Sequence, residues 1–276
     1  MAFKKDTVVG TMIFTITLCL LCSFMITGTA GILKERKLAK KRDELQRFVL
    51  MASDVGLGEG TEFRDIFAKS VKPLLINLDT GKVDSDTNVL DFDERMAAIN
   101  PDTSSTPKKD IAKIKTRAND VRVFKVFDDN GKLSSVVVPF YGKGLWSIIY
   151  GYMAVEPDLN TVKGIVVYEH GETPGIGDFI TDPDWLGLWK GKKLFDDNGK
   201  FAMRLVKGGA KEGDTHGVDA VSGATMTGRG LQRAVEFWFG EEGFQTFFKQ
   251  LKATEGLADP QAGSQGGSQL ENGGAQ

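Results

Sequence analysis

The sequence predicts an α+β fold, in which an N-terminal transmembrane helix precedes an antiparallel-sheet domain with flanking helices. Three observations lead to this expectation: a long uncharged stretch near the N-terminus, several strand-like segments in succession, and apolar residues at helical spacing near the C-terminus. The 276 residues are 41% hydrophobic and 26% charged, which is ordinary for globular protein and excludes collagen-like and wholly disordered chains.

The net charge of −2 is an average of two unlike parts. Residues 1–53 carry nine Lys and Arg against four Asp and Glu, or +5, so residues 54–276 carry 26 against 33, or −7. Because nucleic-acid binding needs clustered basic side chains, the acidic body argues against DNA or RNA as a partner.

The first element is a transmembrane helix over residues 7–33, preceded by a short N-terminal segment, 1–6. No charged residue occurs in these 27 positions, which as a helix exceed the ~30 Å hydrocarbon thickness of a bilayer. The main alternative is a cleavable signal peptide, but its apolar region is typically only about 7–15 residues long. Both cysteines, Cys19 and Cys22, lie inside this helix, and only two histidines occur elsewhere, so we expect no disulfide and no metal site.

Residues 34–55 continue as a basic juxtamembrane helix, since they are rich in helix formers and Lys34–Leu50 contains neither Gly nor Pro. The soluble region follows in two parts, residues 56–120 and a main domain at 121–252. Residues 253–276 are rich in Gly, Gln and Ser and are expected to form a disordered tail.

Strand patterns are concentrated in the middle of the chain. The predicted strands are Val71–Leu78, Arg122–Phe127, Leu133–Phe140, Trp146–Val155, Val162–Glu169 and residues 201–207. The turn Asp128-Asp129-Asn130-Gly131 makes the second and third of these a β-hairpin. After Thr227 the spacing of apolar residues becomes helical, with Leu231, Val235 and Trp238 on one face.

No residue is singled out as catalytic: there is no nucleophile with an obvious base, no P-loop and no dinucleotide-binding glycine motif. Three glycine-containing segments are nevertheless candidate ligand sites. They are Tyr141–Trp146 (YGKGLW), His170–Gly177 (HGETPGIG) and Asp219–Gly228 (DAVSGATMTG). The first offers an aromatic face, the second polar side chains in an irregular loop, and the third hydroxyls at a helix N-terminus suited to a phosphate. Each alone is also explained structurally, as a turn with a core tryptophan, a connecting loop and an N-cap cluster.

Together these segments resemble the NqrC family, the flavin-bearing C subunits of the Na+-translocating NADH:quinone reductase, over essentially residues 1–252. Ser222–Thr227 (SGATMT) matches the family's flavinylation pattern S-G-A-T-x-T without departure. The resemblance implies an FMN-binding domain in which a separate flavin transferase joins FMN to Thr225 through a phosphoester.

The resemblance also suggests roles for the residues around Thr225. We expect the phosphate to be held by Ser222, Gly223, Ala224 and Thr227, and the flavin ring to pack against Leu145, Trp146 and Ile176. The ring's polar edge is expected to face Glu172, Thr173 and Gly175, with Lys207 as a further phosphate or ring-edge contact.

The implied function is that of a membrane-anchored one-electron carrier acting with other membrane subunits, with no independent catalysis. Two alternatives remain: the equivalent subunit of the ferredoxin:NAD-type ion pump, and a flavin-binding sensory or scaffold domain. The family implies a bacterial inner-membrane location with the soluble domain in the periplasm. The positive-inside rule opposes this topology, because two lysines precede the helix and seven basic residues (Lys34, Arg36, Lys37, Lys40, Lys41, Arg42 and Arg47) follow it.

Overall fold

The structure, a computed structural model, describes residues 7–84 and 89–256. It divides into two compact units, one ending at Leu45 and the other beginning at Gln46. This boundary lies within the first helix, α1 (Val8–Ala52), so the two predicted N-terminal helices are one continuous helix. α1 ends three residues before the predicted end at residue 55, and Asp54 beyond it has a φ of 57°. The predicted segment 1–6 lies outside the described residues.

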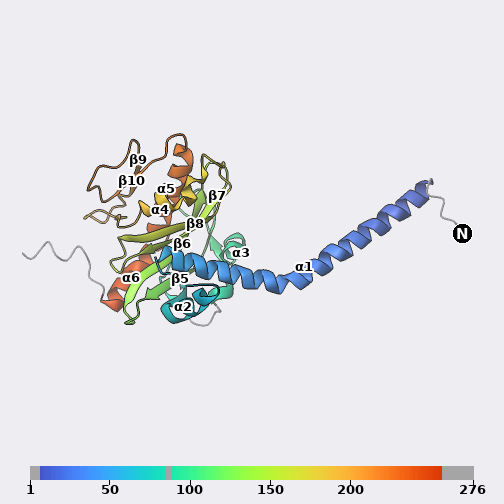
Figure 1. Cartoon of the computed structure of the whole chain (residues 1–276), viewed down its shortest axis with the longest axis horizontal. Coiled ribbons are helices and arrows are strands. Elements are labelled where there is room, and N and C mark those ends of the chain that lie inside the picture. The colour runs from blue at the N-terminus through green and yellow to red at the C-terminus, as the bar shows by residue number, and fades with distance from the viewer. Residues whose placement is uncertain (1–6, 85–88, 257–276) are drawn as a thin grey trace, which may run out of the picture. The chain divides into compact units, whose positions relative to one another are not determined.

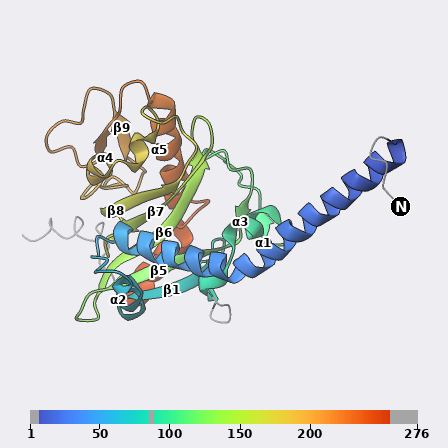
Figure 2. The same cartoon turned by 45° about the vertical axis from the view of Figure 1, so that its right-hand side comes forward.

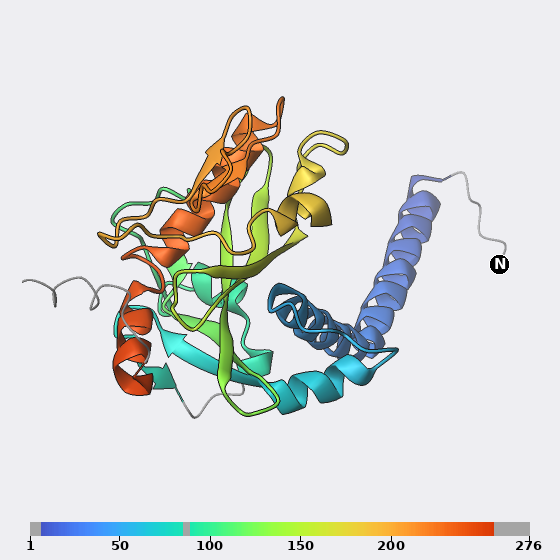
Figure 3. The ribbon, with the colours of Figure 1, turned by 60° about the vertical axis from the view of Figure 1, so that its left-hand side comes forward.

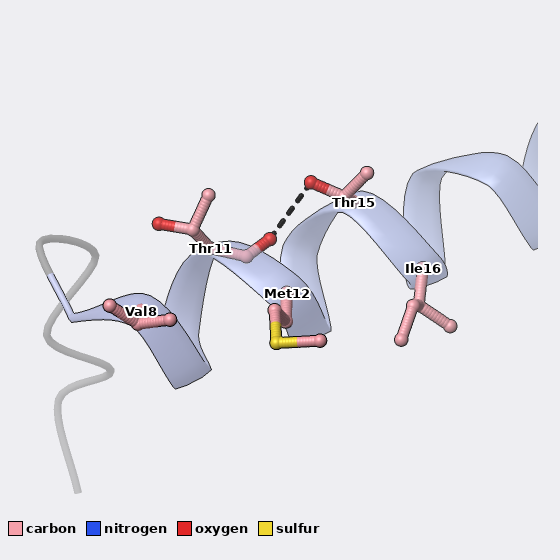
Figure 4. A pocket seen from close by; sticks show the side chains of 5 residues that line it. All are labelled: Val8, Thr11, Met12, Thr15 and Ile16. Atoms are coloured by element: carbon pink, nitrogen blue, oxygen red, sulfur yellow. Dashed lines mark hydrogen bonds between the residues drawn. The ribbon is translucent and has the colours of Figure 1, made fainter.

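The apolar part of α1, Val8–Thr29, has a mean hydropathy of 2.2 and is long and apolar enough to cross a membrane. Its threonine hydroxyls bond within the helix: Thr15 Oγ1 donates to the Thr11 carbonyl oxygen at 2.9 Å (Figure 4), and Thr29 Oγ1 to the Met25 carbonyl oxygen at 2.7 Å. Such internal pairing removes the cost of placing a hydroxyl in hydrocarbon.

The second unit is built on a six-stranded sheet in the order β2-β1-β5-β6-β7-β8, in which all neighbours are antiparallel (Figures 1 and 2). This confirms the predicted antiparallel sheet. The strands are β1 (Val71–Asn77), β2 (Val83–Asp84), β5 (Asp120–Phe127), β6 (Leu133–Lys143), β7 (Ile148–Val155) and β8 (Val162–Glu169). Because β1 pairs along its whole length with β5, the region 56–120 completes the sheet of the main domain and is not a separate part.

The remaining elements surround the sheet. The helices are α2 (Glu62–Ser70), α3 (Glu94–Ile99), α4 (Pro183–Gly187), α5 (Thr225–Phe239) and α6 (Gln245–Glu255), with 3-10 turns at Val89–Asp91 and Asp178–Thr181. Two short pairs stand apart, β3 (Ser104–Ser105) with β4 (Arg117–Ala118), and β9 (Arg204–Val206) with β10 (Gly217–Asp219). The strand predicted at 201–207 is therefore shorter and lies outside the main sheet.

Both faces of the sheet are covered, which explains why β6 is buried on alternate and intervening positions alike. On one face, Val138 and Phe140 of β6 belong to a core that includes Leu231 and Val235 of α5. On the other, Phe48, in the final turns of α1, stacks on Tyr168 at 5.2 Å between ring centroids. Figure 3 shows α5 and α6, in orange and red, on the side of the green strands opposite the end of α1.

A short sequence occurs twice and forms the same turn twice: Phe127–Lys132 and Phe195–Lys200 both read FDDNGK. In each, the first aspartate, Asp128 or Asp196, accepts hydrogen bonds at 2.9 Å from backbone amides two and four residues later. The first copy joins β5 to β6, as the hairpin prediction requires, and Gly131 takes a φ of 75°.

The C-terminal prediction needs correction. Residues 253–255, assigned to the disordered tail, form the last turn of α6, which ends at Gly256 in the left-handed conformation. The Thr254 hydroxyl bonds back to the Gln250 carbonyl oxygen, and Glu255 pairs with Lys125, so this turn is tied to the sheet. Residues 257–276 lie outside the described part of the chain.

Candidate functional site

The three glycine-containing segments meet at one end of the sheet. Residues 144–147 connect β6 to β7, residues 170–177 follow β8, and residues 220–224 lead into α5. The approach of α5 to the first segment is very close: a Cβ added at Gly230 would lie 2.5 Å from the Lys143 carbonyl oxygen. A Cβ added at Gly177 would lie 3.3 Å from Thr227 Oγ1, so the second segment also contacts α5.

The contact between the three segments centres on Glu172, whose side chain is buried. Its carboxylate accepts hydrogen bonds from the backbone amides of Leu145 (3.1 Å), Trp146 (3.0 Å) and Ser147 (3.2 Å). It also accepts one from the hydroxyl of Thr227 in α5, at 2.5 Å. One carboxylate thus joins a loop of the sheet, the loop after β8 and the first turn of α5.

These bonds determine the ionisation of Glu172. Burial by itself raises the pKa of a carboxyl group, but the donors from Thr227 and the loop amides outweigh it and hold the pKa of Glu172 below its ordinary value. Glu172 is therefore a carboxylate at neutral pH. Its expected place at the polar edge of a flavin ring differs from this arrangement, as does the expected contact of the Thr227 hydroxyl with phosphate.

The same bonds explain an error in the predicted strand at 146–155. β7 begins only at Ile148, because the amides of Trp146 and Ser147 donate to Glu172 and not to a neighbouring strand. The loop keeps the side chains of Leu145 and Trp146 outside, 44% and 65% exposed. No local sequence signal gives this partner, which is 25 or more residues away.

Thr225 is the first residue of α5, two residues earlier than the predicted helix start. Ala224 at the N-cap makes no side-chain cap, and among the described residues neither the Thr225 hydroxyl nor the amides of Thr225, Met226 and Thr227 donate to any group. Ser222 and Gly223 form an exposed turn before the helix, with Gly223 at a φ of 85°. The helix thus begins with free donors beside a half-buried hydroxyl.

Two different surfaces flank Thr225. We call the first the apolar patch; it consists of four exposed side chains, Leu145, Trp146, Ile176 and Met226. They come from all three segments that meet at Glu172. Thr173 and Gly175 lie in the turn that presents Ile176: the Thr173 carbonyl oxygen accepts from the amides of Ile176 and Gly177, and Gly175 has a φ of 74°.

The second surface is a groove of about 280 Å³ along the outer side of α5, which we call the basic groove. Its lining includes Thr225 together with three basic residues, Lys207, Arg229 and Arg233. None of the three forms an ion pair or side-chain hydrogen bond with another described residue. The sequence analysis missed Arg229 and Arg233, although their spacing of four and eight residues from Thr225 places all three on one helix face.

The comparisons with known proteins agree with this site. An FMN-binding domain model matches residues 144–240, which begin at the first segment and end just after α5. The chain is 40% identical to the C subunit of the Na+-translocating NADH-quinone reductase of Haemophilus ducreyi, over 92% of this chain and 98% of that protein. It is 41% identical to the same subunit from Vibrio anguillarum, over 91% of this chain and 98% of that protein.

A solved structure gives the same result for the fold. The crystal structure of Shewanella oneidensis NqrC is 88% identical, covers 78% of this chain and 100% of its own, and superposes with a TM-score of 0.77. With identity at this level over nearly the full length of the curated relatives, the chain belongs to the NqrC family, the C subunits of the Na+-translocating NADH-quinone reductase.

Proposed function

We propose that this chain carries FMN joined to Thr225 by a phosphoester and acts as a membrane-anchored one-electron carrier in a sodium-pumping NADH:quinone reductase. The observation that carries the proposal is the surroundings of Thr225. Its hydroxyl starts a helix whose first amides are free, and it lies between an apolar patch and a basic groove.

The residues present fit the two halves of FMN. A phosphodiester is anionic, and the free amides of α5 with Lys207 and Arg229 supply donors and positive charge next to Thr225 Oγ1. The flavin ring is flat and largely apolar, and Trp146, Leu145 and Ile176 offer exposed apolar surface for it. Bound FMN supplies reversible one-electron oxidation and reduction, and the protein supplies attachment, orientation and electrostatic environment.

Within this proposal Ser222, Gly223 and Ala224 retain their expected role beside the phosphate, because the turn they form is exposed except at Ala224 and precedes the free amides. Thr173 and Gly175 remain candidates for the ring's polar edge, since both are exposed beside Ile176. Lys207 lines the basic groove and therefore belongs to the phosphate side.

Attachment is tested by co-expressing the full chain with a flavin transferase and viewing a denaturing gel under ultraviolet light. We expect a fluorescent band that survives denaturation, disappears in Thr225→Ala and persists in the matched control Ser222→Ala. A band that persists in Thr225→Ala would place the attachment elsewhere. Reduction of the flavin by NADH with the partner subunits present, lost in Thr225→Leu, tests the role as carrier.

We further propose that Val8–Thr29 anchors the chain in the bacterial inner membrane and that the flavin domain lies in the periplasm, where the flavin transferase acts. The apolar helix supports the anchor. The basic residues that follow it oppose the orientation, so topology needs its own experiment. A periplasm-specific reporter fused after Gly256, beyond the end of α6, should be active; activity only from a cytoplasm-specific reporter would reverse the topology.

A further inference from the structure

Glu172 is a buried carboxylate whose four hydrogen-bond donors are all neutral, and no ion pair to it forms within residues 7–84 and 89–256. A buried charge without a counter-charge is costly unless every acceptor site on it is used. Here each oxygen accepts two bonds: Oε1 from the amides of Trp146 and Ser147, and Oε2 from the Leu145 amide and the Thr227 hydroxyl.

Because both oxygens are fully used, the carboxylate has no acceptor site left for a flavin ring. Its surroundings leave no room either. A Cβ added at Gly144 would lie 2.6 Å from Glu172 Oε1, and one added at Gly177 would lie 2.8 Å from Glu172 Cβ. The two glycines enclose the side chain, so it works inside the protein and not at the surface that contacts the ligand.

What the carboxylate joins is specific to the proposed flavin site. On one side it holds three consecutive amides of the loop that exposes Leu145 and Trp146, half of the apolar patch. On the other side it holds Thr227, two residues after Thr225 in the first turn of α5. The attachment residue and the ring-packing side chains are far apart in sequence, and Glu172 is the group that both sides bind.

We propose that Glu172 is a positioning residue that holds the loop at Leu145–Ser147 and the first turn of α5 in one fixed arrangement, so that a flavin joined to Thr225 packs against Trp146 and Leu145. This inference rests on the proposed function, because it assumes flavin at Thr225. It assigns Glu172 no contact with the flavin itself.

The first test needs no variant. In the full chain, hydrogen exchange at neutral pH should show protection of the amides of Leu145, Trp146 and Ser147, although two of these residues have exposed side chains. In Glu172→Gln we expect about 10-fold faster exchange, the factor corresponding to the loss of one hydrogen bond to a charged group. Glu156→Gln changes an exposed glutamate without a described side-chain hydrogen bond and is the matched control. Unprotected amides in the unaltered chain would overturn the proposal.

The second test uses the flavin as a probe, in full chain co-expressed with the transferase. We expect the flavin in Glu172→Gln and Thr227→Val to remain attached but to show lower fluorescence anisotropy and a changed midpoint potential. Thr227→Ser keeps the hydroxyl and should restore both properties. The double variant should be no worse than either single one, because both remove the same connection.

The outcomes separate the two proposals. If the unaltered chain carries no covalent flavin, the proposed function fails, while the exchange test still decides the role of Glu172 in the loop. If flavin is attached normally and its anisotropy and potential are unchanged in Glu172→Gln and Thr227→Val, the proposed function stands and the positioning role is refuted.

Discussion

Two glycines of α5, Gly230 and Gly228, allow the close packing of this helix to be tested quantitatively. A Cβ at Gly230 would meet backbone, 2.5 Å from the Lys143 carbonyl oxygen and 2.8 Å from Gly144 Cα. Neither atom can move without shifting the end of β6. A Cβ at Gly228 would meet only the end of the Leu205 side chain, at 2.8 Å, and this side chain is only partly buried.

We therefore expect opposite results from the same substitution. Alanine gains about 1 kcal/mol over glycine in a helix interior, while overpacking against rigid atoms costs about 1–3 kcal/mol. Because the contact at Gly230 is with backbone, Gly230→Ala should take the upper part of that range and lose about 1–2 kcal/mol net. Gly228→Ala should be neutral or slightly stabilising, since Leu205 can change rotamer.

Thermal unfolding of the full chain in detergent, followed by circular dichroism, measures both variants. For a folded unit of this size 1 kcal/mol corresponds to about 2–4 °C, so Gly230→Ala should lower the Tm by about 2–8 °C, and Gly228→Ala should leave it within about 2 °C. If Gly230→Ala were as stable as the unaltered chain, or if Gly228→Ala were the more damaging, the close approach of α5 to the 143–144 backbone would be wrong.

Three further predictions concern single interactions. Because the folded state holds the pKa of Glu172 below its ordinary value of 4.5, its stabilising contribution is present above that pH and is lost as pH falls through the lowered folded pKa; acid unfolding should be shallower in Glu172→Gln. Arg95→Gln removes a two-fold hydrogen-bonded pair with Glu169 and a guanidinium lying 3.8 Å from the Tyr150 ring centroid, and, since both charged groups are about half exposed, should cost only about 0.5–1.5 kcal/mol in urea unfolding, decreasing with added salt. Alanine at Asp128 and, separately, at Asp196 should each cost about 1 kcal/mol by the same measurement, because the two turns have the same bonds; a loss at only one would show that the repeated turns are not equivalent.

The elements that could be predicted are those whose signal is local. The apolar run that begins α1, the hairpin around Asp128–Gly131 and the strand at 162–169 are each encoded within a short window by length, turn residues or alternation. The errors occur where a distant group takes over the backbone. β7 starts late because Glu172 binds the amides at 146 and 147, and α6 extends past the predicted tail because Glu255 pairs with Lys125.

The same division applies to the site. The motif SGATMT and the glycine-containing segments are visible in the linear chain and suffice to indicate family and cofactor. The roles of individual side chains are not visible there. Glu172 and Thr227 have the residue types of ligand contacts, yet they bind each other, and Arg229 and Arg233 attract no notice until α5 places them beside Thr225.

The physical reason is the range of the interactions involved. Helix and strand periodicity, turn chemistry and membrane length depend on neighbours a few residues apart, so the amino-acid order alone specifies them. Which of two polar groups remains available to a ligand depends on what else reaches it in three dimensions. For Glu172 that is decided by a loop 25 residues earlier and a helix 55 residues later, which only the folded chain brings to the same carboxylate.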